Sequence, residues 1–349
     1  MLYEMPAIQH VSARTIKEAV SFLSQNGGRT QVLAGGTDLL GLMKDRVKGP
    51  GLNIPQMLVN IRAIPELQQI TEEADGVTIG AAVPLSRLET SVLGGKFPLL
   101  LQAAGQVGTT QIRNMGTIAG NICQRPRCLY FRHPDFICFK KGGKGCFASG
   151  GEHRFYHSIL QYGKCLMAHP SDLAPALLAL RADAVLAGPE GERTVPLKDF
   201  FSDGNHPRET ILKGDEMITR FRLPYSQARQ IFLKNRIRQT SDFALVSVAA
   251  AVRFSEKRCE DVSIVLGGVA PYPYIASAAE KMLKGKPIGK DLIGEAAEAA
   301  LRDARPLPDN GYKVDLAKTL VERALWALGT KAIQPDGRRT ENPALSKRT

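Results

Sequence analysis

The heptapeptide Ala34-Gly35-Gly36-Thr37-Asp38-Leu39-Leu40 connects an apolar segment at residues 31–33 to an apolar run that ends at Met43. This pattern predicts a short strand, a glycine turn and a helix for which Thr37 is the N-cap. A glycine pair lets backbone N–H groups approach a ligand closely, and a helix N-terminus attracts phosphate. Because the spacing is not G-x-G-x-x-G, the heptapeptide does not indicate a Rossmann dinucleotide site. An ordinary turn between two elements explains the segment equally well.

The segments around this turn alternate between helix and strand, which predicts a small mixed α/β unit. Apolar residues at helical spacing predict a helix over residues 15–23. A run of Thr, Gly and Asn at 108–121 predicts a second backbone cradle for an anionic group rather than a helix with a packed face. Further elements predicted before Pro224 are strands at 57–61 and 217–223, hairpins at 70–83 and around 188–191, and helices at 85–91, 97–107 and 173–182. Ser171 or Asp172 is the expected cap of the last helix.

A domain boundary is predicted near Pro224, where the hairpin and helix pattern of the first part ends. Beyond it, strand-like segments precede two amphipathic helices at 290–303 and 314–328, which is the pattern of a small sheet covered by helices. The predicted class is therefore α+β. The predicted domains are a first domain at 1–224 with lobes at 1–57 and 58–224, a C-terminal domain at 225–330 and a polar, disordered tail at 331–349.

Five of the six cysteines fall within one stretch of the chain. They are Cys123, Cys128, Cys138, Cys146 and Cys165. The stretch has too few apolar residues at any regular spacing to bury itself, and a loop of about 40 residues without structure is rare in a compact domain. A four-thiolate metal centre would hold such a loop, because the free energy of metal binding replaces the missing burial. The loop at 122–168 is therefore predicted to be an insertion around a metal site.

The spacing of the cysteines bears on the identity of the metal. Structural zinc sites usually take ligands from close C-x2-4-C pairs. In this stretch, by contrast, nine, seven and eighteen residues separate Cys128, Cys138, Cys146 and Cys165 from one another. This spacing favours an iron–sulfur cluster over zinc, although it matches neither common ferredoxin pattern. The many basic residues of the loop also favour a cluster, whose net negative charge needs nearby cations. The alternative is a solvated basic loop with buried or disulfide-linked cysteines, and nothing in the sequence indicates the secretion that a disulfide scaffold requires.

Composition and charge restrict the possible partners. The chain has 349 residues, is 44% hydrophobic and carries a formal net charge of +12, which permits binding to nucleic acid, a membrane surface or acidic proteins. The basic residues are dispersed and no nucleic-acid-binding motif accompanies them, so we expect no nucleic-acid partner. No segment reaches the roughly 18 apolar residues of a membrane span, and the N-terminus lacks a signal-peptide pattern. We expect a cytoplasmic protein, or a periplasmic one exported with a signal-bearing partner.

Five separated motifs follow one another along nearly the whole chain. They are Ala34-Gly35-Gly36-Thr37-Asp38-Leu39-Leu40, Thr117-Ile118-Ala119-Gly120-Asn121, Ser171-Asp172, Ser241-Asp242-Phe243-Ala244-Leu245-Val246-Ser247-Val248-Ala249 and Leu266-Gly267-Gly268-Val269-Ala270. In this order they resemble the FAD-binding medium subunit of the molybdenum hydroxylases, the family of xanthine dehydrogenases, aldehyde oxidoreductases and carbon monoxide dehydrogenases. The resemblance implies a two-part FAD-binding region, a small βα subdomain plus a mixed α/β subdomain, followed by a C-terminal antiparallel sheet covered by helices.

The resemblance also implies which residues contact FAD. They are Leu33, Ala34, Gly35, Gly36, Thr37, Asp38, Leu39, Thr109, Thr117, Ala119, Gly120, Asn121, Asp172, Ile218 and Lys234. The second motif begins with Ala119 where the family commonly has glycine, which is still a small residue. No triad, paired carboxylates or metal-bound water site accompanies the motifs, so no catalytic residue is expected. His133, His153 and His157 are expected to be satisfied or solvent-facing rather than general bases.

The cysteine loop narrows the resemblance to medium subunits with an inserted [4Fe–4S] cluster. Residues 124–132, 145–146 and 165–172 are most similar to the aldehyde oxidoreductase type. The similarity implies that the cluster ligands are Cys128, Cys138, Cys146 and Cys165. Cys123 is then a small packing residue, and Cys259 is structural.

The implied function is electron transfer within a heterotrimer or a dimer of heterotrimers. Substrate is hydroxylated in a large molybdopterin-binding subunit, electrons pass through a small [2Fe–2S] subunit, and FAD in this chain delivers them to an external acceptor such as ferredoxin or NAD. Two alternatives remain open. A subunit resembling that of 4-hydroxybenzoyl-CoA reductase would move electrons toward molybdenum, and a four-cysteine zinc protein would be a scaffold without flavin.

Overall fold

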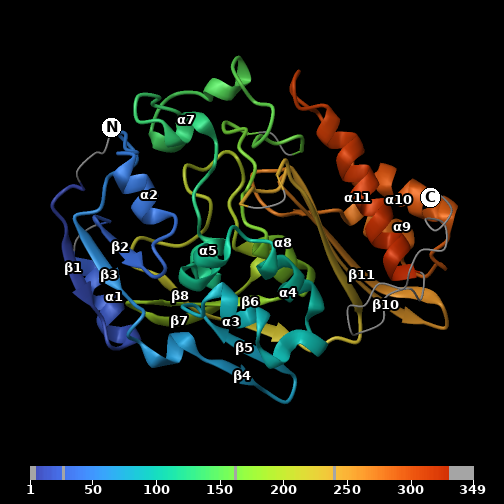
Figure 1. The fold of residues 1–349 in the computed structure, drawn as a ribbon, viewed down its shortest axis with the longest axis horizontal. Coiled ribbons are helices and arrows are strands. Elements are labelled where there is room, and N and C mark those ends of the chain that lie inside the picture. The colour runs from blue at the N-terminus through green and yellow to red at the C-terminus, as the bar shows by residue number, and fades with distance from the viewer. Residues whose placement is uncertain (1–4, 26–27, 161–162, 239–240, 330–349) are drawn as a thin grey trace, which may run out of the picture.

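The structure of the protein is a computed structural model that describes residues 5–25, 28–160, 163–238 and 241–329. Three sheets with their helices follow one another across the molecule (Figure 1), and the predicted α+β class is confirmed. The predicted tail at 331–349 lies outside the described residues. Within the described ranges, no helix is long and apolar enough to cross a membrane.

The first sheet is parallel and holds the glycine turn. Its strands lie in the order β1-β3-β2. The elements are β1 (Gln9–Ser12), α1 (Ile16–Gln25), β2 (Thr30–Leu33), α2 (Leu39–Lys44) and β3 (Met57–Asn60). The predicted first helix forms because Ala19, Val20 and Leu23 fall on one face and are buried together. The sequence pattern misses β1, because this strand is mostly exposed and has no apolar alternation.

The second sheet is antiparallel, with strands in the order β4-β5-β8-β6-β7. Its strands are β4 (Ile70–Glu72), β5 (Gly76–Gly80), β6 (Asp183–Gly188), β7 (Gly191–Pro196) and β8 (Met217–Pro224). The helices of this lobe are α3 (Leu85–Glu89), α4 (Pro98–Gly105) and α8 (Leu173–Ala179), with 3-10 turns at Pro65–Gln68, Val92–Gly95 and Leu197–Asp199. The last helix is buried along its whole length, and Ser171 caps it by accepting a hydrogen bond from Ala174 N–H (3.0 Å).

Two short helices occupy the run at 108–121, where none was predicted. They are α5 (Thr110–Met115) and α6 (Ile118–Ile122). Thr109 caps α5 by accepting a hydrogen bond from Ile112 N–H (3.3 Å). Thr117 caps α6 by accepting one from Gly120 N–H (3.2 Å), and α6 buries its two isoleucines. The prediction of a run without a packed helix was wrong for α6, because a capping threonine and two apolar residues suffice for one turn.

The third sheet is antiparallel in the order β12-β11-β10-β9, and three helices cover it (Figure 1). The elements are β9 (Arg229–Asn235), β10 (Val246–Ser255), β11 (Arg258–Gly267), β12 (Tyr274–Ile275), α9 (Ser277–Leu283), α10 (Lys290–Ala300) and α11 (Tyr312–Gly329). Phe232, Ala249 and Val265 belong to the core shared with α4 and α8, whereas Ala250 belongs to the core under α9 to α11. Both faces of the sheet are buried at residues 246–252 of β10 and 262–267 of β11, and these stretches are mostly apolar.

The cysteine loop at 122–168 is largely irregular, as predicted, but it shares a small core with the first lobe. Its helical turns are α7 (Leu129–Arg132) and 3-10 turns at Phe139–Lys141 and Phe147–Ser149. Tyr130 and Phe131 are buried against Leu42 and Val47 of the first lobe. The loop is therefore ordered in part by packing against the first lobe, a support that the sequence analysis did not predict. Its apolar residues are irregularly spaced, and a periodic pattern does not reveal them.

Lys313, at the start of α11, connects the last part of the cysteine loop to the C-terminal domain through hydrogen bonds. The residue is 0% exposed. Its Nζ donates hydrogen bonds to the carbonyl oxygens of Phe155 (3.1 Å), His157 (2.8 Å) and Gly268 (2.6 Å). An ammonium group has three donors, and all three are used here. One side chain thus joins α11, the cysteine loop and the end of β11.

We predict that Lys313→Met lowers the free energy of unfolding by about 2 kcal/mol or more, because three buried carbonyl groups lose their donor. Lys281→Met, at an exposed position of α9, is the matched control and should leave the protein unchanged. Thermal unfolding of both variants checks the prediction. Equal melting temperatures for the two variants would contradict the role of Lys313.

Candidate functional site

A cleft of about 520 Å³ lies between the first sheet and the second lobe. Its volume falls within the roughly 300–1,000 Å³ of ligand pockets. Most of its lining comes from four parts of the chain, namely β2 with the glycine turn and the start of α2, the loop at 51–53, α6 with the start of the cysteine loop, and the segment at 207–218. Single residues elsewhere complete it, among them Lys140. The two motifs predicted to bind an anionic group therefore face the same space.

The glycine turn brings the backbone of the first lobe against the end of α5. Gly36 has a φ of +70°, in the left-handed region that favours glycine. A Cβ at Gly35 would overlap the carbonyl oxygen of Met115. Leu40 N–H donates to Gly36 O (3.1 Å), so the turn continues directly into α2. Both glycines are required by this geometry, and both line the cleft.

Asp38 also lines the cleft, but its carboxylate is bound by the cysteine loop. Oδ1 accepts from Arg132 Nη2 (2.6 Å) and Arg127 Nη2 (2.9 Å), and Oδ2 accepts from the backbone N–H of Arg125 (2.8 Å). These charge-assisted contacts join the glycine turn to the loop. The predicted cap was wrong, because Asp38 rather than Thr37 precedes α2 and no side chain caps this helix.

The second predicted motif forms the opposite wall of the cleft through α6. Ala119 N–H donates to Ala81 O (3.2 Å), which fixes α6 against the turn that follows β5. Thr117 caps the helix, and Thr117, Ala119 and Gly120 line the cleft. Because these side chains are small, the backbone of α6 lies close to the cleft.

The cleft brings together most of the predicted FAD contacts. Those that line it are Leu33, Ala34, Gly35, Gly36, Thr37, Asp38, Leu39, Thr117, Ala119, Gly120 and Ile218. Thr109, Asn121, Asp172 and Lys234 are not among the lining residues. Thr109 caps α5, as described above. Asn121, on α6, and the buried side chains of Asp172 and Lys234 belong to a polar group around the start of α8.

This polar group supports the wall of the cleft. Ser171 Oγ donates to Asn121 Oδ1 (2.6 Å), next to the cleft-lining part of α6. Lys234 Nζ pairs with Asp172 Oδ2 (2.6 Å) and donates to Gln106 O (3.0 Å). Burial raises the pKa of the Asp172 carboxyl, and the charge of Lys234 opposes that rise. The pair connects the start of α8 to β9, and thus the first domain to the C-terminal domain.

Sequence reasoning missed the segment at 207–214 and the charged residues that it holds. Glu209 is buried, and its carboxylate pairs with Arg125 Nε (2.7 Å) and Lys140 Nζ (3.1 Å). Arg125, Lys140 and Glu209 all line the cleft. The segment is mostly irregular and carries no motif, so no sequence signal places it beside the glycine turn.

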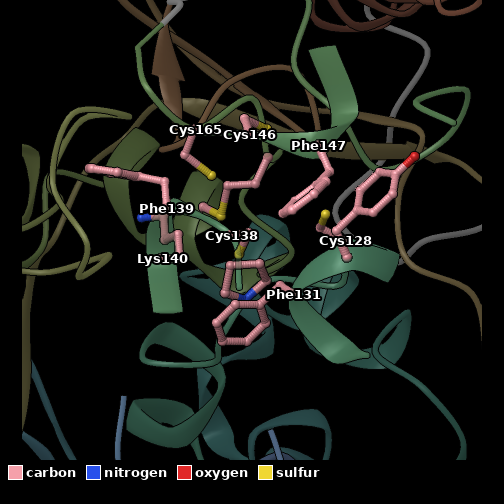
Figure 2. A pocket seen from close by; sticks show the side chains of 11 residues that line it. Cys128, Phe131, Cys138, Phe139, Lys140, Cys146, Phe147 and Cys165 are labelled. Carbon is pink, nitrogen blue, oxygen red and sulfur yellow. The ribbon is translucent and has the colours of Figure 1, made fainter. Parts of the chain in front are cut away.

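A second, smaller cavity adjoins the cleft, and four cysteines line it. They are Cys128, Cys138, Cys146 and Cys165, the four predicted metal ligands, and all are free thiols. Figure 2 shows their side chains reaching from separate parts of the loop toward one space. The other lining residues are Pro126, Tyr130, Phe131, Phe139, Lys140, Phe147 and Met167. The cavity is therefore a sulfur-rich site with aromatic walls and one buried cation.

Burial and hydrogen bonds set the charge state of these thiols. Burial raises the pKa of Cys128 to about 11 and also raises that of Cys138. A hydrogen bond between Cys146 and Cys165 lowers the pKa of Cys146 to about 6 and raises that of Cys165. Backbone N–H groups that donate to the four sulfurs come from residues 130, 131, 140, 141, 148, 149, 166 and 167. Donors of this kind stabilise sulfur that carries negative charge.

In the part of the chain that the structure describes, no group of three His, Cys, Asp or Glu side chains could hold a metal ion together. The three histidines of the loop have other roles. His153 Nε2 accepts from Asp309 N–H (3.1 Å), and His133 Nδ1 accepts from the N–H of Asp135 (3.3 Å). His157 Nε2 lies 3.3 Å from a cavity sulfur, and burial lowers the pKa of its imidazole to about 4.

The two remaining cysteines lie outside the cavity. Cys123 lines the cleft at the end of α6, and burial raises the pKa of its thiol to about 12. Cys259 is fully buried on β11, in the core under the C-terminal helices. Both are neutral thiols packed among apolar groups.

Comparison with known proteins gives two family matches. The family described as the FAD binding domain in molybdopterin dehydrogenase matches residues 6–226, and the CO dehydrogenase flavoprotein C-terminal domain matches residues 232–328. The chain is 30% identical to the carbon monoxide dehydrogenase medium chain of Hydrogenophaga pseudoflava over 92% of this chain and 98% of that one.

A second sequence relative and a solved structure agree with these matches. The chain is 32% identical to the FAD-binding subunit of an aldehyde oxidoreductase from Escherichia coli, over 92% of this chain and 98% of the relative. The solved structure of the carbon monoxide dehydrogenase from Hydrogenophaga pseudoflava superimposes with a TM-score of 0.75 at 30% identity, and covers 93% of this chain and 98% of that one.

We predict that Gly35→Ala weakens FAD binding at least about tenfold, which corresponds to about 1.4 kcal/mol. The new Cβ meets the Met115 carbonyl, so the glycine turn must move. Gly41→Ala is the matched control, because a Cβ there meets nothing within 4 Å. Titration of the flavin-free protein with FAD measures both affinities. Equal affinities for the two variants would show that the turn does not hold the flavin.

A second prediction concerns His169, a buried imidazole between the cysteine loop and α8. Burial lowers its pKa to about 3, and the nearby charge of Lys140 adds to the effect. Since the unfolded value is about 6.5, His169 leaves stability unchanged above that pH. Below it only the unfolded chain takes up the proton, so stability falls as the pH drops toward 3.

We predict that wild-type protein loses up to about 1.4 kcal/mol per pH unit below pH 6.5 through this residue. His169→Asn should make the decline from pH 6.5 to pH 4 shallower, whereas His10→Asn, on an exposed part of β1, should not. Urea unfolding at a series of pH values measures the slopes. Parallel curves for wild type and His169→Asn would exclude this source of acid sensitivity.

Proposed function

The chain belongs to the FAD-binding medium subunits of the molybdenum hydroxylases, and from this premise we propose that it is an electron-transfer subunit that holds FAD and a [4Fe–4S] cluster. In this proposal it passes electrons between the [2Fe–2S] clusters of a small partner subunit and an external acceptor such as ferredoxin or NAD. The substrate that donates these electrons binds and is oxidised in a large molybdopterin-containing partner. The observation that carries the proposal is the pair of adjoining cavities, one lined by the two glycine-containing motifs and the other by four free cysteines.

The large cleft supports the flavin part of the proposal. Its volume suits a dinucleotide, and a Cβ at Gly35 would disrupt the turn that lines it. The residues that would hold FAD are the eleven predicted contacts that line the cleft. FAD accepts electrons singly and in pairs, and the protein supplies its position and its electrostatic surroundings.

The cysteine cavity supports the cluster part of the proposal. Four thiols, backbone N–H donors at every sulfur and the buried cation of Lys140 form a donor set that fits a negatively charged iron–sulfur centre. A [4Fe–4S] cluster takes one thiolate at each iron, so its ligands lie around a space rather than around one point. Cys128, Cys138, Cys146 and Cys165 line such a space.

The residues of this chain bind and orient cofactors rather than a substrate. The glycine turn and α6 form two walls of the cleft, and Asp38 connects the turn to the cysteine loop. The aromatic residues Tyr130, Phe131 and Phe147 help to shield the cysteine cavity from water. Partner subunits are proposed because several similar proteins are themselves described as medium chains or FAD-binding subunits.

We predict that anaerobically purified full-length protein shows flavin absorption and contains about four iron and four sulfide per chain. Cys128→Ser, Cys138→Ser, Cys146→Ser and Cys165→Ser should each lose most of the iron. Cys123→Ser and Cys259→Ser are the matched controls and should keep it, because neither thiol lines the cysteine cavity. Iron, sulfide and zinc analysis with visible spectra gives the readout.

The same measurements separate the parts of the proposal. Flavin without iron would leave a FAD-binding subunit and remove the cluster. Zinc in place of iron, lost equally from the four loop variants, would make the cavity a structural metal site. Protein without flavin after incubation with FAD would overturn the proposed function as a whole.

A further inference from the structure

Lys140 belongs to the walls of both cavities. It lines the FAD cleft together with Arg125 and Glu209, and it lines the cysteine cavity next to Cys138 and Cys165. Figure 2 shows it beside the cysteines, on the 3-10 turn that follows Cys138. The residue is 2% exposed. A long charged side chain is rarely buried to this degree unless it is paired.

The contacts of Lys140 fix its ammonium group within this wall. Nζ pairs with Glu209 Oε1 (3.1 Å) and donates to the carbonyl oxygen of His206 (3.0 Å). Glu209 also pairs with Arg125 Nε (2.7 Å), so one carboxylate faces two cations. These three side chains together carry one positive charge in excess. Such an excess in a buried wall is stabilised by an anion on either side of it.

Lys141, the next residue, shows that burial alone does not create this arrangement. It is also fully buried, but its Nζ donates to the carbonyl oxygen of His133 (2.6 Å), and it lines neither cavity. Lys140 is thus distinguished from its neighbour by its place between the two sites rather than by its charge or burial.

We propose that Lys140, held by Glu209, is a positioning residue common to both cofactor sites and that its positive charge raises the reduction potential of the cluster held by the four cysteines. This inference rests on the proposed function. Each electron that enters an iron–sulfur centre adds one negative charge, and a nearby buried cation favours that state. The low dielectric of the buried wall strengthens the effect.

The same charge acts on the flavin side of the wall. Reduction of FAD also increases negative charge in the cleft, so the ammonium group favours the reduced form of both cofactors. The charge of this one side chain therefore influences the reduction potentials of both FAD and the cluster. A residue that only supported the loop would affect cofactor content and stability, but not the potential of a fully occupied site.

The test is an anaerobic redox titration of the full-length protein, followed by visible spectroscopy for FAD and by electron paramagnetic resonance for the cluster. Lys140→Gln removes the charge and keeps a polar side chain, whereas Lys140→Arg keeps the charge. Lys144→Gln removes a lysine from an exposed position of the same loop that lines neither cavity. Iron and flavin content are measured for every variant.

We expect Lys140→Gln to shift the midpoint potential of the cluster to more negative values at wild-type iron content, with a smaller shift for FAD in the same direction. Lys140→Arg should restore the wild-type potential in large part, and Lys144→Gln should not change it. Glu209→Gln provides a second variant with the opposite expectation, because removing the paired carboxylate leaves Lys140 uncompensated and should shift the cluster potential to more positive values.

Other outcomes would overturn the inference. Wild-type potentials in an iron-loaded Lys140→Gln variant would show that its charge does not act on the cluster. Loss of iron in both Lys140→Gln and Lys140→Arg, with an unshifted potential in Glu209→Gln, would make the wall merely structural. A wild-type chain without iron would instead remove the proposed cluster, and with it this role of Lys140, while leaving FAD binding in place.

Discussion

The carboxylate of Asp38 is the contact on which the arrangement of the two cavities depends. It follows the glycine turn, yet its oxygens accept from Arg127, Arg132 and the backbone of Arg125. The turn that lines the cleft and the loop that lines the cysteine cavity are therefore fixed to each other. The guanidinium of Arg127 also lies over the ring of Phe243 (4.5 Å), which adds the C-terminal domain to the same junction.

The wall between the cavities is built from charges that do not balance. Glu209 is the carboxylate of this wall, Asp38 is the carboxylate at the glycine turn, and each pairs with two cations of the cysteine loop. Burying charged groups costs free energy, and the attraction within an ion pair only partly offsets that cost. A buried set of ion pairs with excess positive charge therefore contributes little to the stability of the fold. An uneven set of charges is better suited to binding anions, such as the flavin phosphates and the cluster of the proposed function, which would compensate the excess. The proposed ligands therefore account for this part of the protein better than folding stability does.

The predictable parts of the structure are those with a local cause. The all-apolar α8, the apolar runs of β10 and β11 and the glycine turn each have a pattern within a few residues, and each was predicted. The α5 and α6 turns depend on single capping threonines, which a search for periodic patterns overlooks. Lys140 and Glu209 meet only because the segment at 207–214 passes over the cysteine loop, and no local pattern contains that information.

The cysteine loop shows even more clearly that a local sequence pattern does not reveal contacts between distant parts of the chain. Crowded cysteines suggested that metal binding alone orders the loop, as in domains that are unfolded without zinc. The structure provides other supports, namely the small core around Phe131, the contacts to Asp38 and the three hydrogen bonds of Lys313. Because the contacts to Asp38 and the hydrogen bonds of Lys313 do not involve the cysteines, the free energy of cofactor binding is not the sole source of order in the loop. The four thiols thus lie in a cavity lined by residues of the cysteine loop itself, and contacts to the first lobe and to the C-terminal domain support that loop from outside.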